Sequence, residues 1–322
     1  MRNIRFLLIL LLCAALTGCA ALGSGSFNGE ASDCAASGTE NVRIVCTSFP
    51  CYDFARAVAG ESADMRMLIR PGGEVHAYEP TPTDILDIAG CDLFIYIGGE
   101  SDVWVDSILE SFGEAAPQTL RLFDCVEALE EETLAEMTFH EAVEEEEEPE
   151  YDEHIWTSPK NAVRMLRSVA EALGQILPQD AVSTNAEHYI AQIEDLDAQI
   201  RMLVQNAHRN TLVFADRFPL LYFVREYGLN YTAAFPSCTS ESEPSAHTVA
   251  ALIDRIRAEE IPVVFQLELS SGRIAQSIAE ETGAAIRTFY SVQNITQTDF
   301  ERGETYVTLM EKNIDALKEA LN

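Results

Sequence analysis

Two histidines in similar sequence surroundings are the residues of this chain whose type and spacing best suit a binding or catalytic role. His76 follows a glycine-rich stretch and precedes Thr81-Pro82, and His154 precedes Ser158-Pro159. Serine and threonine cap helices and proline suits the first helical position, so each histidine precedes a rigid helix start. Imidazole is the commonest side chain that binds zinc and similar metals. A lone loop histidine would be interpreted as solvent-exposed, but this pair predicts a transition-metal site.

An acidic tract lies between the two histidines. Residues 140–153 carry nine carboxylates and neither lysine nor arginine, and such dense like charge predicts a loop disordered by self-repulsion. One interpretation is a weak collector of divalent cations, because mobile carboxylates bind them without selectivity. The other interpretation is a solvated insertion, and the sequence alone leaves both open.

The elements that must position the histidines follow an α/β rhythm. From Val42 onward, short runs of apolar and β-branched residues alternate with helical patterns, which indicates parallel sheets. The predicted strands are 42–45, 65–69, 93–97 and 119–123, and then 212–215, 231–234, 263–267 and 286–289. We therefore expect an α/β fold of two lobes with mainly parallel sheets.

One long helical pattern separates these two sets of strands. It runs for about seven turns without glycine or proline, long enough to join two lobes. We expect an N-terminal lobe at 41–180, a linking helix at 181–207 and a C-terminal lobe at 208–322. A metal would then bind in the cleft between the lobes, where loops at strand ends converge.

The first 19 residues are typical of a bacterial lipoprotein signal peptide. Arg2 and Arg5 flank the start of an apolar run that is shorter than the ~20 residues needed to span a bilayer. Leu16-Thr17-Gly18-Cys19 is similar to a lipobox, in which Cys19 would be lipidated. Residues 20–40 would form a flexible tether. The prediction is a lipid-anchored protein on the extracellular face of the cell membrane; an ordinary secretory signal is the alternative.

Charge and cysteine content narrow the possible partners. The formal charge of −32 becomes −34 without Arg2 and Arg5, which disfavours nucleic acid and attracts cations, although it also serves solubility. The cysteines after Cys19 lack CxxC spacing, so a cysteine-rich zinc site is not expected. Because disulfides form outside the cell, we expect one among Cys46, Cys51 and Cys91.

The histidine segments resemble the zinc- and manganese-binding solute-binding lipoproteins of ABC importers (cluster A-I). The resemblance covers nearly all of the chain after the tether. It implies that His76 and His154 are first-lobe metal ligands, that a rigid helix joins the lobes, and that a monomer delivers Zn²⁺, or Mn²⁺, to an ABC transporter permease. The segments that carry it are His76 with Tyr78-Glu79-Pro80-Thr81-Pro82-Thr83-Asp84, His154-Ile155-Trp156 with Ser158-Pro159, Tyr222-Phe223, Tyr227-Gly228-Leu229, Glu243-Pro244-Ser245, and Gly303-Glu304 with Tyr306.

The second lobe departs from this family pattern. The position of a His or Glu ligand before the Tyr-Phe pair falls on Arg217, whose guanidinium cannot bind a metal. The position of a late aspartate falls near Tyr290, and both Tyr290 and Gln293 are poor zinc ligands. These departures put the second-lobe ligands in doubt.

Replacement ligands are therefore sought near the strand ends. Asp216 ends a predicted strand and is the leading candidate, although it could instead pair with Arg217 or serve in a turn. Glu268 lies near another strand end, and Cys238 is a further thiolate candidate for which a structural role is favoured. Two histidines with one or two carboxylates and a water satisfy a divalent ion, and imidazole favours zinc whereas more oxygen ligands favour manganese.

Transport without catalysis is the expected function. The chain has no HExxH helix, no Gly-x-Ser-x-Gly elbow and no phosphate loop. This argues against a metallohydrolase, in which an open metal site activates water. A surface adhesin or structural protein with a degraded metal site is the third possibility, and the changed second-lobe positions keep it open.

Overall fold

The computed structural model describes residues 41–131, 150–235 and 244–322. The predicted signal peptide with Cys19, the tether, residues 140–149 of the acidic tract and Cys238 lie outside these ranges. No helix within them has both the length and the apolar content that crossing a membrane requires.

The first lobe is built on a four-stranded parallel sheet in the order β2-β1-β3-β4. β3 is fully buried, which explains its unbroken apolar sequence. Besides the helices, this lobe has four short 3-10 turns, two of them between β3 and β4 and two after β4. The strands are β1 (Val42–Cys46), β2 (Ala63–Met67), β3 (Leu93–Tyr96) and β4 (Gln118–Arg121), and the turns are η1 (Glu100–Asp102), η2 (Gly113–Ala115), η3 (Leu122–Cys125) and η4 (Ile155–Thr157).

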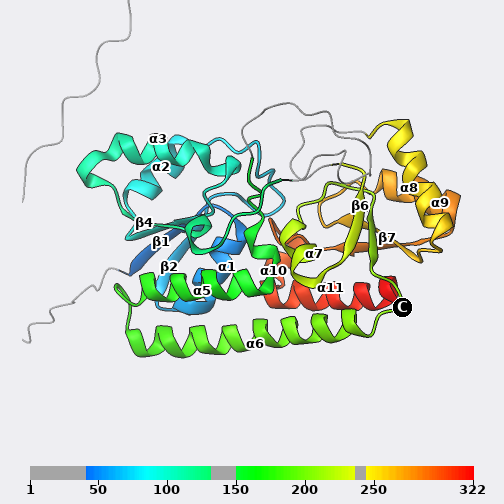
Figure 1. Ribbon diagram of the computed structural model, residues 1–322. Coiled ribbons are helices and arrows are strands. Elements are labelled where there is room, and N and C mark those ends of the chain that lie inside the picture. The colour runs from blue at the N-terminus through cyan, green and yellow to red at the C-terminus, as the bar shows by residue number, and fades with distance from the viewer. Residues whose placement is uncertain (1–40, 132–149, 236–243) are drawn as a thin grey trace, which may run out of the picture. The chain divides into compact units, whose positions relative to one another are not determined.

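Helices cover both faces of this sheet (Figure 1). α2 (Pro82–Ala89) and α3 (Val103–Phe112) pack on one face, where Ile88 and Val105 join Val45 of β1 in an apolar cluster. α1 (Phe49–Ala59) and α5 (Pro159–Leu173) cover the other face, toward which Ile44 points. Neighbouring residues of β1 thus face opposite layers, as the pleat of a strand requires.

The second lobe repeats the design with the order β6-β5-β7-β8, again all parallel. α8 (Ala246–Ala258) and α9 (Arg273–Thr282) cover one face of this sheet. α7 (Leu221–Tyr227) and the C-terminal α11 (Tyr306–Leu321) cover the other. The strands are β5 (Thr211–Phe214), β6 (Asn230–Ala233), β7 (Val263–Leu267) and β8 (Ala285–Phe289), and the short α10 (Gln297–Glu301) precedes α11.

A single long helix, α6 (Gln179–Gln205), joins the two lobes (Figure 1). It contacts α1 and α5 of the first lobe and α7 and α11 of the second. One buried cluster runs from Ile44 in β1 through Ile193 in α6 to Leu321 at the end of α11. The predicted fold class, two parallel α/β lobes joined by a long helix, is confirmed.

The expected disulfide is wrong. Cys46, Cys51 and Cys91 are buried free thiols. Cys46 and Cys51 belong to the large cluster that includes α1 and α5, whereas Cys91 packs with α2 and α3 on the opposite face of the sheet. Burial raises the pKa of the Cys51 thiol to about 12 and that of Cys91 to about 11, so both act as small core side chains.

The last residues of the acidic tract also differ from the prediction. Glu150–Glu153 are part of the fold: the Glu131 amide donates to the Glu150 carbonyl at 2.8 Å, and Glu130 forms an antiparallel bridge with Tyr151. Asp152 and Glu153 are buried. The expected loop therefore does not extend through residue 153, because these two carboxylates have partners in the first lobe.

Candidate metal centre

The candidate site lies at the carboxyl ends of the parallel strands, where loops of an open α/β sheet form a crevice. In the first lobe, loops after β2, β3 and β4 contribute, and in the second lobe loops after β5, β7 and β8. The residues at these ends are His76, Ser101, Glu153 and His154 in the first lobe, and Asp216, Glu268 and Gln293 in the second.

Three side chains of the first lobe converge: those of His76, Glu153 and His154. One possible ligand atom of each lies within 4.8 Å of the others, and across residues 41–131, 150–235 and 244–322 this is the one such group. The two imidazole rings have centroids 5.8 Å apart. The structure thus brings together the two predicted histidines, and it adds a carboxylate that the sequence analysis had not singled out.

His154 is fully buried and held by Asp152. The Asp152 carboxylate accepts from the His154 amide at 2.7 Å and lies 3.0 Å from ring Nδ1. With Nδ1–H donating to Asp152, Nε2 is the ring atom that would bind a metal. A carboxylate behind a metal-binding imidazole fixes its tautomer and raises its basicity. The ring also packs edge-on against Trp156, with centroids 5.4 Å apart.

Glu153 is fixed by the loop after β3. The Ser101 amide donates to its carboxylate at 2.8 Å, and the Ser101 hydroxyl donates to the other oxygen. Burial opposes ionisation, but the hydrogen bond with His76, the charge of His154 and the Ser101 donors outweigh it and lower the Glu153 pKa to about 2. Glycine at position 99 permits the approach, since a Cβ there would lie 2.2 Å from the Cβ of Glu153.

His76 completes the group from a well-anchored loop. Its side chain is 23% exposed, and Nδ1 lies 2.8 Å from the Ser101 hydroxyl and 3.2 Å from Glu153. Its loop ends at a capping box, in which Thr81 and Asp84 bond each other's amides at the start of α2. Ser158 likewise caps α5 after His154. The predicted helix starts are thus confirmed, and they fix the loops that carry both histidines.

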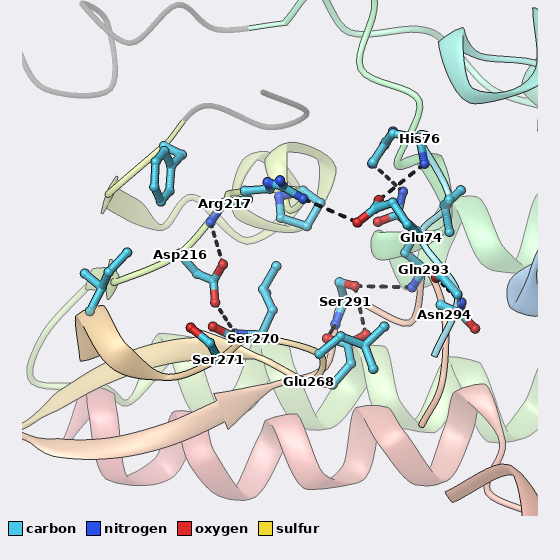
Figure 2. Close-up of a pocket in the computed structure, with 17 residues that line it drawn as sticks. Glu74, His76, Asp216, Arg217, Glu268, Ser270, Ser271, Ser291, Gln293 and Asn294 are labelled. Atoms are coloured by element: carbon cyan, nitrogen blue, oxygen red, sulfur yellow. Dashed lines mark hydrogen bonds and ion pairs between the residues drawn. The ribbon is translucent and has the colours of Figure 1, made fainter. Parts of the chain in front are cut away.

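The structure does not place the Asp216 carboxylate in this group. It follows β5 and lines a cavity of 280 Å³ beside His76 (Figure 2). One of its oxygens accepts from the Arg217 amide at 2.9 Å and the other from the Leu267 amide at 3.0 Å. Asp216 therefore ties the ends of β5 and β7 together, the turn role that the sequence left open.

Glu268 has a similar structural task. Its carboxylate accepts from the Ser291 amide and hydroxyl at 2.9 Å and from the Val292 amide at 3.0 Å. Burial is the main reason why its pKa rises to about 7. Glu268 lines the cavity but lies outside the group of three ligand atoms, and it shapes the loop after β8 (Figure 2).

Arg217 faces the first lobe across the cavity. One of its guanidinium nitrogens lies 3.8 Å from the carboxylate of the largely exposed Glu74 (Figure 2). A permanently protonated guanidinium cannot bind a metal, so this position supplies an ion pair at the rim instead of a ligand.

The donor set of the group fits a divalent transition metal. Two imidazoles and one carboxylate are common zinc ligands, and zinc sites with three protein ligands keep a further position for water or another donor. The buried Glu153 is ionised over the physiological range because of its low pKa, so it needs no deprotonation before it binds a cation. The sequence held one signal for Glu153, a carboxylate directly before His154, but the surrounding acidic tract concealed it.

The chain is similar to known zinc-uptake proteins over most of its length. Residues 44–320 match the family model described as zinc-uptake complex component A, periplasmic (ZnuA). The chain is 28% identical over 310 residues to the high-affinity zinc uptake system protein ZnuA of Bacillus subtilis, covering 94% of this chain and 93% of that protein.

A longer relative and two solved structures are also similar to this chain. The zinc-binding lipoprotein AdcA of Streptococcus pneumoniae is 28% identical over 282 residues, 86% of this chain, and the chain spans about half (55%) of its length. The Zn(II)-bound ZnuA-like domain of that AdcA superposes with a TM-score of 0.73 at 26% identity, covering 87% of this chain and 99% of the domain. The metal-dependent lipoprotein YcdH of B. subtilis gives 0.74 at 25% identity, covering 87% and 100%.

Proposed function

The chain belongs to the ZnuA family of periplasmic zinc-uptake components, as its sequence motifs predicted, and from this premise we propose that it captures zinc outside the cell for an ABC importer. The observation that carries the proposal is the convergence of His76, Glu153 and His154 at the strand ends of the first lobe. The zinc ion is the cargo of the protein, and its release to a permease completes the function.

Zinc is favoured over manganese by the donor set. Two of the three converging side chains are imidazoles, which suit zinc, whereas manganese prefers a shell richer in oxygen. Asp216 and Glu268 were the oxygen ligands expected from the second lobe, but backbone amides occupy their carboxylates. A site built on the three first-lobe donors alone is poorer in oxygen than the sequence predicted, which supports the preference for zinc.

Capture, and not turnover, is the role that we assign to the bound ion. The relatives that the chain matches are named for zinc binding and zinc uptake. A lipid anchor at Cys19 would hold the protein near its permease, and we retain a monomer as the transporting form. These parts of the proposal rest on the sequence motifs and on the family.

The direct test is metal stoichiometry and affinity of the full chain. The metal-stripped protein is titrated with Zn²⁺ by calorimetry, and its metal content after dialysis is measured by mass spectrometry. We expect one tightly bound zinc per chain. The double substitution His76→Ala and His154→Ala should abolish it, whereas His188→Ala, an exposed histidine on α6, should not.

The outcomes separate the alternatives. If the double variant still binds one zinc tightly, the site does not lie at His76 and His154. Absence of tight zinc from the wild-type chain would favour an adhesin or structural protein with a degraded site. Zinc-dependent hydrolysis of an ester or phosphate substrate that is lost in the double variant would replace transport with catalysis.

A further inference from the structure

We propose that the 280 Å³ cavity binds a second ligand besides the metal, namely a free α-amino acid with an apolar side chain. The guanidinium of Arg217 donates to the carboxylate of this molecule, and the carboxylate of Glu74 accepts from its ammonium group. Both residues line the cavity and face each other across it. The site goes beyond the proposed function, because neither residue belongs to the three side chains that converge on the metal.

The cavity has the size of a small-molecule site and a shape that the fold maintains. Ligand pockets in proteins begin at about 300 Å³, so this space suits a single amino acid better than a peptide. Hydrogen bonds join its two walls: the Asn294 side chain donates to the Gly73 carbonyl at 2.7 Å, and the Gly72 amide donates to the Ile295 carbonyl at 2.8 Å. A site that is formed in advance loses less free energy to ordering when a ligand binds.

Apolar side chains from both lobes form part of the cavity lining. Leu269 is 48% exposed, an unusual position for a large apolar side chain in a cleft. Covering such surface with an apolar group removes it from water and is therefore favourable. The side chain of the amino acid would lie here. The apolar lining residues are Val75, Pro219, Phe235, Leu267, Leu269 and Ile274.

Two of the three carboxylates in the lining already have donors from the protein itself. Asp216 accepts from two backbone amides, one on each oxygen. Glu268 accepts from two backbone amides and from the Ser291 hydroxyl. Of the acidic and basic lining residues, Arg217 and Glu74 are therefore the pair best placed to bind a charged ligand.

The distance between Arg217 and Glu74 leaves both groups able to bind a ligand. Their closest nitrogen and oxygen atoms are 3.8 Å apart (Figure 2), beyond the ~3.2 Å that a hydrogen bond spans. The two side chains are 34% and 56% exposed, and ion pairs of this kind contribute little. An amino acid carries opposite charges on adjacent groups, so its carboxylate can accept two parallel bonds from the guanidinium while its ammonium group donates to Glu74.

The charge of the cavity favours a zwitterion over a simple anion or a simple cation. The lining carries three carboxylates and one guanidinium, and the chain has a formal charge of −32, so an anion is repelled. A cation without a carboxylate would leave the Arg217 guanidinium unmatched and be repelled by it. An amino acid has no net charge and matches both groups, which makes leucine a suitable probe.

Calorimetric titration of the metal-stripped full chain with leucine tests the proposal. We expect one bound leucine per chain. Arg217→Ala should weaken leucine binding by about 10-fold to 100-fold, the range for losing a hydrogen bond to a charged group. The matched control is Arg257→Ala, which removes an exposed guanidinium of α8 that pairs with Glu281; this variant should bind leucine as the wild type does.

Two analogues of leucine test how its charged groups are recognised. Isocaproate lacks the ammonium group and isoamylamine lacks the carboxylate, so both should bind the wild type more weakly than leucine does. Glu74→Gln should weaken the binding of leucine without weakening that of isocaproate, because the ammonium group is the part that contacts Glu74. Equal binding of leucine and isocaproate by the wild type, or an equal loss for both in Glu74→Gln, would overturn the recognition of a zwitterion.

The remaining outcomes separate this site from the metal centre. Absence of saturable binding at millimolar leucine, or full binding by a folded Arg217→Ala variant, would overturn the proposal; circular dichroism verifies the fold of each variant. Leucine binding that requires zinc and ignores Arg217→Ala would make the amino acid a zinc ligand, and would also overturn it. Tight zinc binding without leucine binding would refute this inference alone, whereas leucine binding by a chain that does not hold zinc would refute the proposed function alone.

Discussion

Glu153 shows how much of the candidate site depends on neighbours that are distant in sequence. In the sequence it is one of nine carboxylates in a tract without a cation, and nothing in its type separates it from the others. In the fold it meets Ser101, which is 52 residues away, and His76. The histidines could be predicted because their own flanking residues fix them locally, but the choice of one carboxylate among nine required the tertiary contacts.

Glu153→Gln is the residue-scale test of the group. The substitution keeps the shape and removes the charge that faces the ion, so zinc affinity should fall by at least the roughly 10-fold to 100-fold that is typical of losing an outer partner. Competition titration of the full chain measures the loss. The matched control is Glu150→Gln, which replaces an exposed carboxylate three residues earlier; this variant should bind zinc as the wild type does. Equal effects of the two substitutions would show that Glu153 contributes only its negative charge and is not a ligand.

At the scale of elements, periodicity and capping signals predicted the sheets well. β7 matches its predicted range at both ends, and the other strands shift by one or two residues. α3 was not predicted, because Val103-Trp104-Val105 is a β-branched and aromatic run that favours a strand. Tertiary packing overrides this preference: Val105 is buried in the α2–α3 cluster, whereas Val103 is 69% exposed.

Most of the acidic tract can be removed as a unit, because the residues that flank 132–149 lie next to each other. The Glu131 amide and the Glu150 carbonyl are joined by a hydrogen bond of 2.8 Å, so a short Gly-Ser link can replace residues 132–149 without moving Tyr151 or the residues after it. We expect the shortened chain to keep one tight zinc, and to lose only weak additional cation binding if the tract collects cations. Calorimetry measures both.

A longer deletion provides the contrast. Removal of residues 132–153 takes away Asp152 and Glu153 as well, so tight binding should disappear although the number of deleted residues is similar. A shortened chain that keeps residues 150–153 but loses its tight zinc would show that the removed tract supplies a ligand, and the first-lobe group would then be incomplete.

Asp102, at the start of α3, should make the stability of the fold depend on pH. Asp102 is 5% exposed and accepts from the amides of Ile97 and Gly98; burial is the main cause that raises its pKa from 3.8 to about 6. The folded state therefore keeps a proton that the unfolded state loses, and stability falls as the pH rises from about 4 to 6. This difference in pKa corresponds to at most about 3 kcal/mol.

Asp102→Asn removes this dependence. An asparagine oxygen can accept from the same two amides but carries no charge. The free energy of unfolding of the variant should therefore increase relative to that of the wild type as the pH rises from 4 to 7. The gain should level off above the pKa of about 6. Urea unfolding at several pH values measures it, and a constant difference between the two proteins would contradict the assignment.

At the scale of the whole molecule, hydrogen bonds between residues of the first and second lobes hold the lobes together. The Asp53 carboxylate of α1 accepts from the Tyr306 amide at the start of α11, and the Tyr306 hydroxyl donates to the Trp156 carbonyl. The Trp156 indole donates to the Ser291 carbonyl beyond β8, and the Tyr222 hydroxyl of α7 donates to the Asp152 carbonyl. With α6 in contact with both lobes, closure on zinc should be small, unlike that of a flexible hinge.

The shared core makes a final prediction about unfolding. Because one buried cluster includes β1, α6, β5 and α11, neither lobe can unfold without exposing apolar surface of the other, so the metal-free chain should melt in a single calorimetric transition with equal calorimetric and van't Hoff enthalpies. Zinc held mainly by the first lobe should then raise the melting temperature of the whole molecule, by the equivalent of about 2.7 kcal/mol at a free concentration of 100 times Kd. Two transitions, of which zinc moves only one, would show instead that the lobes are independent and that the cleft between them opens more freely than the shared core allows.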